Sequence, residues 1–98
     1  MSNDEQMAEI GRLVTDAAES SKNEILLKSK LENYAKRFSH LSAAINGELQ
    51  LGPTYQELTK ALAEGIPTEQ EVRETVVEWR NERARSIELE SRKKALGI

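Results

Sequence analysis

Apolar residues recur along the first half of the chain in steps that alternate between three and four residues. This spacing is the heptad pattern of a helix that packs one stripe of side chains against another helix. The stripe, here called the heptad seam, consists of Ile10, Leu13, Ala17, Ser20, Glu24, Leu27, Leu31, Tyr34, Phe38, Leu41 and Ile45. Val14, Ala18, Ile25 and Ala35 widen it, as a helix in a globular bundle requires. The pattern therefore predicts a long N-terminal helix over residues 4–46.

Two polar residues, Ser20 and Glu24, occupy core positions of the heptad seam, and they leave two interpretations open. The sequence Ser21-Lys22-Asn23-Glu24 has the spacing of a capping box, so the helix can break near Ser20-Ser21 into a pair of helices. A continuous helix over 4–46 would be roughly 64 Å long. That length exceeds what a compact domain of about 100 residues accommodates. In a continuous helix, Glu24 would fix the register of the packing.

Two further helix starts are predicted in the second half. Asn46-Gly47 has the sequence of a helix end, and Thr54 and Thr68 each precede a glutamate by three residues, as in a capping box. These signals predict a short helix over 55–64, ended by Gly65, and a long helix over 69–95.

The predicted last helix has an apolar stripe in its front half and is mostly charged in its rear half. Val72, Val76 and Trp79 form an apolar stripe at helical spacing, whereas charged residues dominate after Trp79. We expect the front half to pack within the chain. The rear half would be partly solvated, would fray at its end, or would contact a partner through Ile87 and Leu89.

Together these patterns predict an all-α fold. The expected architecture is one domain over residues 1–98, an elongated helical hairpin or bundle of three or four helices, with the C-terminal helix antiparallel to the first. The chain has 98 residues and no cysteine, which excludes disulfides and thiolate zinc sites. We find no apolar run long enough to cross a membrane and no signal-peptide pattern, so a cytoplasmic protein is expected.

The charge distribution is more informative than the net charge of −3. Residues 1–21 contain five acidic residues and one basic residue, whereas residues 22–37 contain five basic and two acidic residues. Such a dipolar segment can pair antiparallel with a copy of itself, because opposite charges then meet. The alternative interpretation is an ordinary solvated surface.

The sequence provides little support for catalysis. His40 is the single histidine, it has no cysteine to activate, and we interpret it as a surface residue near a helix end. The five glycines are scattered and form no phosphate-binding loop. We therefore predict no catalytic, metal-binding or cofactor-binding residues.

A small DNA-binding regulator is the alternative function, because residues 54–78 can be interpreted as a helix-turn-helix. The start of its recognition helix contains Glu69, Glu71 and Glu74 against Arg73 alone. Carboxylates at this position repel phosphates, so nucleic-acid binding is disfavoured.

The leading hypothesis is a non-enzymatic helical protein that forms a homodimer and binds a protein partner. Trp79 is either an interface anchor or a core residue with Arg83 over its ring. The small size and the charge suit an accessory, regulatory or inhibitor protein such as phages and mobile elements encode. The predicted interface residues are Leu27, Leu31, Tyr34, Phe38, Leu41, Val72, Val76, Trp79, Arg80, Arg83 and Ile87.

Overall fold

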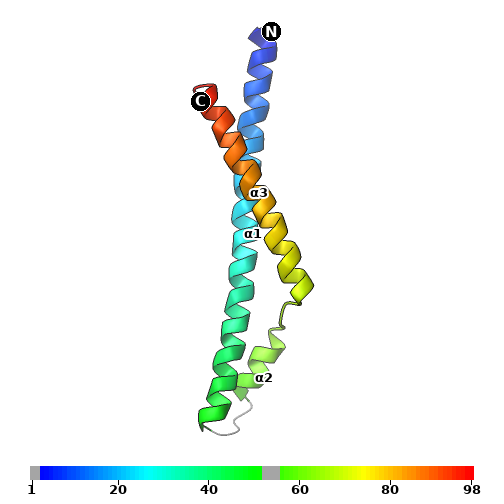
Figure 1. Cartoon of the computed structure of the whole chain (residues 1–98), viewed down its shortest axis with the longest axis vertical. Coiled ribbons are helices and arrows are strands. Elements are labelled where there is room, and N and C mark those ends of the chain that lie inside the picture. The colour runs from blue at the N-terminus through cyan, green and yellow to red at the C-terminus, as the bar shows by residue number, and fades with distance from the viewer. Residues whose placement is uncertain (1–2, 52–55) are drawn as a thin grey trace. The chain divides into compact units, whose positions relative to one another are not determined.

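The computed structural model describes residues 3–51 and 56–98. Within these two ranges the chain forms three helices and no strand, and Figure 1 shows their order. The helices are α1 (Asn3–Leu51), α2 (Gln56–Ala63) and α3 (Glu69–Ala95). The prediction of an all-α fold is therefore confirmed, and α3 has the predicted bounds.

The chain divides into two compact units, and both α1 and α3 contribute residues to each. The first unit contains the described residues 3–28 and 76–98, and the second contains residues 29–75 without the gap at 52–55. The expectation of one domain over residues 1–98 stays a prediction.

Helix α1 is continuous through Ser20-Ser21, so the alternative with two N-terminal helices is wrong. The Ser20 side chain is fully buried, with none of its surface exposed, and its Oγ donates a hydrogen bond of 3.3 Å to the backbone carbonyl of Glu82. The hydroxyl is thereby satisfied inside a helix contact. Ser20 marks a place where α3 approaches α1, not a helix break.

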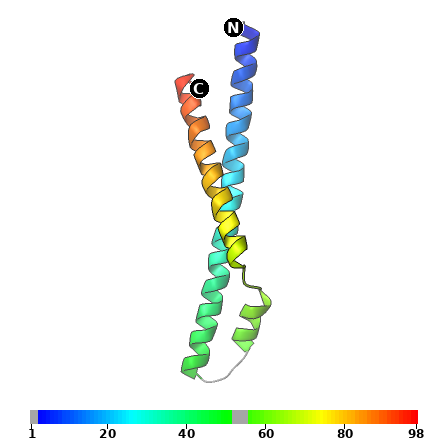
Figure 2. The same ribbon diagram turned by 45° about the vertical axis from the view of Figure 1, so that its right-hand side comes forward.

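The first unit is an antiparallel pair of helices. Leu13 and Ala17 of α1 form a buried cluster with Leu89 of α3, whereas Ser20, further along α1, meets Glu82, earlier in α3. The two helices therefore run in opposite directions, as Figure 2 shows. Leu89 is only 7% exposed, so it packs on α1, whereas most other residues in the rear half of α3 are exposed.

The second unit places α2 antiparallel to the adjacent part of α1. His40 of α1 contacts Glu64, just after α2, and the buried Ala44 and Ala61 line the same groove between the helices. Figure 2 shows α2 beside the C-terminal part of α1. Alanine on both helices lets a short helix of eight residues approach α1 closely.

The buried face of α1 departs from the heptad seam toward the C-terminus. Leu13, Ala17 and Tyr34 are buried seam positions, but Phe38 is 43% exposed and Ala44 is buried in place of the predicted Ile45. In the second unit Ala44 lines the groove together with Ala61 of α2, so the buried face of α1 there is the face that α2 covers.

The predicted end of the first helix at Asn46-Gly47 is wrong, because α1 continues to Leu51. The following residues, Glu48 to Gln50, are good helix formers, so a glycine in the helix interior is tolerated at a cost of about 1 kcal/mol. Gly65 does end its helix as predicted. Its φ is +80°, and its N–H donates to the Leu62 carbonyl at 3.1 Å.

Both ends of α3 are capped. The Glu71 N–H donates to Thr68 Oγ1 at 3.1 Å, which confirms the N-cap at Thr68, whereas Thr54 lies outside the described residues. At the C-terminus Gly97 has a φ of +76°, and the N–H groups of Gly97 and Ile98 each donate at 3.0 Å to carbonyls of the last turn. This is a Schellman motif, which satisfies carbonyls at the C-terminus of α3.

The position of Gly47 inside α1 leads to a stability prediction. We expect Gly47→Ala to raise the free energy of unfolding by about 0.5–1 kcal/mol, because alanine loses less backbone entropy in a helix. A Cβ at this position meets no atom within 4 Å. Urea unfolding followed by circular dichroism measures the change.

Gly65→Ala is the matched control. It also meets no atom within 4 Å, but its positive φ should make the substitution destabilising by about 1–2 kcal/mol. If Gly47→Ala destabilised the protein as Gly65→Ala does, the continuous helix would be wrong and Gly47 would be a helix cap.

Candidate protein-interaction surface

The predicted interface residues separate into buried and exposed groups. Tyr34 is buried, with 8% of its surface exposed. The half-buried members are Leu27, Leu31, Leu41, Val72, Val76 and Trp79. The exposed members are Phe38, Arg80, Arg83 and Ile87. The structure therefore covers most of the heptad seam with residues of the same chain, and the exposed residues are the ones available to a partner.

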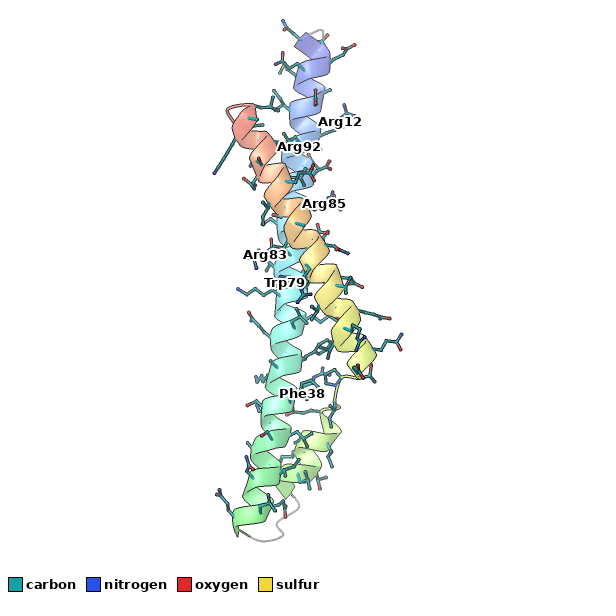
Figure 3. All side chains as sticks on the ribbon, in the orientation of Figure 1. Arg12, Phe38, Trp79, Arg83, Arg85 and Arg92 are labelled. Carbon is teal, nitrogen blue, oxygen red and sulfur yellow. The ribbon has the colours of Figure 1, made fainter. Side chains whose placement is uncertain are left out.

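Trp79 lies in the first unit, half-buried on α3. The Arg83 guanidinium carbon lies 5.4 Å from the centroid of the indole ring, the geometry of a cation–π interaction. Figure 3 shows both side chains. The indole Nε1 is buried and has no hydrogen-bond partner among the described residues, which is unusual for tryptophan and costs free energy. Trp79 thus packs partly within the chain while Arg83 extends its surface outward.

Further exposed residues follow this tryptophan along α3. Ile87, about two turns later, is 62% exposed. Arg80 and Arg83 are also exposed. Tryptophan and arginine are enriched at the energetically important positions of protein interfaces. This part of α3 therefore combines apolar surface with fixed positive charge, which suits a protein partner.

Sequence reasoning missed an exposed apolar stripe on α1. Met7, Val14 and Ile25 are 71%, 45% and 65% exposed, and all three belong to the first unit. Val14 and Ile25 were expected to widen the buried seam, whereas they lie to one side of it. Their spacing was visible in the sequence, but a pattern alone does not say which of two neighbouring stripes a helix buries.

The second unit contains a side-chain hydrogen bond that joins α1 to the turn after α2. His40 Nδ1 lies 3.1 Å from Glu64 Oε2, and both side chains are nearly half exposed. The sequence prediction of a surface histidine agrees with this exposure. The two residues are 24 positions apart in the sequence, so local sequence patterns do not predict their contact.

The segment interpreted as a helix-turn-helix begins its second helix with an acidic surface. Arg73, the cation expected there, is paired with Glu69 one turn earlier on α3. Glu71 and Glu74 are exposed beside them. The positive charge that a phosphate would need is thus compensated locally, and DNA binding by residues 54–78 stays an untested prediction.

Residues 3–51 and 56–98 contain no group of three or more histidine or carboxylate side chains arranged to hold a metal ion. Over the same ranges, none of the helices has the length and apolar character needed to cross a bilayer.

Comparison with known proteins gives no further guide. No protein-family model matches the chain, and neither a curated protein nor a solved structure shows significant similarity to it. The surface must therefore be interpreted from its own residues.

The different burial of two aromatic residues on α1 leads to a second stability prediction. Tyr34→Ala should lower the free energy of unfolding by about 3–5 kcal/mol, since its ring is buried. Phe38→Ala should cost only about 1–2 kcal/mol, because 43% of Phe38 is already exposed to water. Urea titration of both variants measures the difference. Equal losses would contradict this expectation and show that Phe38 is a core residue.

Proposed function

We propose that this protein is a non-enzymatic helical interaction module of the cytoplasm. It self-associates and binds a protein partner as a small accessory, regulatory or inhibitor protein. Its small size and mixed charge suit the accessory proteins that phages and mobile elements encode.

The main support is the imbalance between buried and exposed apolar side chains. In the first unit the buried apolar cluster consists of Leu13, Ala17 and Leu89, whereas Met7 and Ile87 each expose more than 60% of their surface. Helices normally bury their apolar stripes against another layer of structure. The first unit provides only two helices, so a second chain is the natural source of that layer.

The surface of α3 around Trp79 is the part that we assign to a protein partner. Arg80 and Arg83 provide planar donors for carboxylates, and Ile87 provides apolar area one turn after Arg83. A partner with an acidic and apolar helix face would complement it.

Self-association is tested by light scattering coupled to size-exclusion chromatography. We expect a mass of about 22 kDa or more, since two chains of 11.0 kDa give 22 kDa, at concentrations of about 100 µM. The mass should persist in about 1 M salt, where the Debye length is about 3 Å, because apolar contacts provide most of the affinity. A mass of one chain at this protein concentration would contradict the proposal.

A further inference from the structure

The exposed stripe on α1 is a second, complete heptad pattern beside the buried seam. It comprises the exposed residues Met7, Gly11, Val14, Ala18, Ser21 and Ile25. The steps between them alternate between four and three residues, the spacing by which one helix packs along another. All of them lie in the first unit, and none belongs to the buried cluster that joins α1 to α3.

The sizes of these side chains favour a close helix contact. Gly11, Ala18 and Ser21 are small and lie between the larger Met7, Val14 and Ile25. Small residues let two helix axes approach, and a large side chain of one helix then fills the space above a small one of the other. The stripe has large residues at both ends, which suits a partner helix of the same length.

The spacing of the stripe is also the same in both directions along the helix. Adding Asp4 before Met7 and Lys28 after Ile25 gives steps of three, four, three, four, three, four and three residues. Reversing the helix maps the pattern onto itself. In an antiparallel pair, Met7 faces Ile25 of the other copy, Val14 faces Ala18, and Gly11 faces Ser21.

The charges at the two ends of the stripe favour antiparallel over parallel pairing of two copies of α1. In the antiparallel pair the Asp4 carboxylate of one copy lies beside the Lys28 ammonium of the other, at both ends of the contact, in addition to the interaction that Lys28 makes within its own chain. In a parallel pair Asp4 would meet Asp4 and Lys28 would meet Lys28, and like charges at such close range repel. The surrounding residues agree, because residues 1–21 are mostly acidic and residues 22–37 mostly basic.

We propose that a second copy of this chain packs antiparallel on the Met7–Ile25 stripe of α1, with Asp4 of each copy beside Lys28 of the other. This inference rests on the self-association in the proposed function and specifies its surface and direction.

Disulfide trapping between two variants tests the direction. The chain has no cysteine, so Met7→Cys and Ile25→Cys each provide a single thiol. Mild oxidation of an equilibrated mixture should give a cross-linked dimer in several-fold higher yield than oxidation of either variant alone. In the antiparallel pair two residues at position 7 lie about 27 Å apart, whereas a disulfide requires Cα atoms within about 7 Å. Both native side chains are mostly exposed, so the fold should tolerate the substitutions.

A second measurement tests the surface with a matched control. The double variant Val14→Gln, Ile25→Gln should weaken the dimer at least tenfold by light scattering over a dilution series. Leu26→Gln should leave it unchanged, since Leu26 is 59% exposed, similar to Ile25 at 65%, but points about 100° away around α1. Circular dichroism should show equal helix content in all three proteins.

The outcomes separate this inference from the proposed function. A monomeric wild-type chain would overturn both. A stable dimer that forms cross-links in each variant alone would show a parallel pair and overturn only the antiparallel inference. A dimer that gives no cross-link and resists the double variant would show that another surface holds the copies together.

Discussion

The close contact between α1 and α3 at Ala17 and Ser20 determines how the first unit is built. Both residues are small and almost completely buried, at 3% and 0% exposure, and the Ser20 hydroxyl is satisfied by the Glu82 carbonyl. Small side chains bring the helices together but bury little apolar area. A buried methylene is worth about 0.8 kcal/mol, so this contact provides far less stabilisation than a row of leucines would. The contact therefore fixes the register of the two helices, but it buries only a small apolar core.

The remaining large apolar side chains of the first unit are exposed, and the proposed dimer would bury part of them. Met7, Val14 and Ile25 lie on α1 to one side of the small-residue contact, and Ile87 lies exposed on α3. A solvated pair of helices would gain by burying them, and the opposite charges of Asp4 and Lys28 at the two ends of the α1 stripe suit an antiparallel second copy. The proposed dimer thus follows from the same constraint that makes the intrachain core thin.

The sequence predicted the helices well because helix signals are local. The heptad spacing, the cap at Thr68 and the stop at Gly65 each act over a few residues, so they could be interpreted without the fold. Ser20 was interpreted as a weak place because its partner, Glu82, is 62 residues away. Phe38 was placed in the core because the heptad pattern does not show that α2 covers a neighbouring face of α1, the one that contains Ala44. The exposed stripe was missed for a similar reason: two adjacent stripes share one helix, and only packing shows which one is buried.

The central claim is that the chain completes its core with another copy of itself, and the dependence of thermal unfolding on protein concentration tests it most directly. Association stabilises the native state by mass action, so the midpoint of unfolding must rise with concentration. Between about 1 and about 100 µM, the account predicts a rise of several degrees in Tm by circular dichroism. A Tm that is the same at both concentrations would contradict it, because a chain that folds alone has no such dependence.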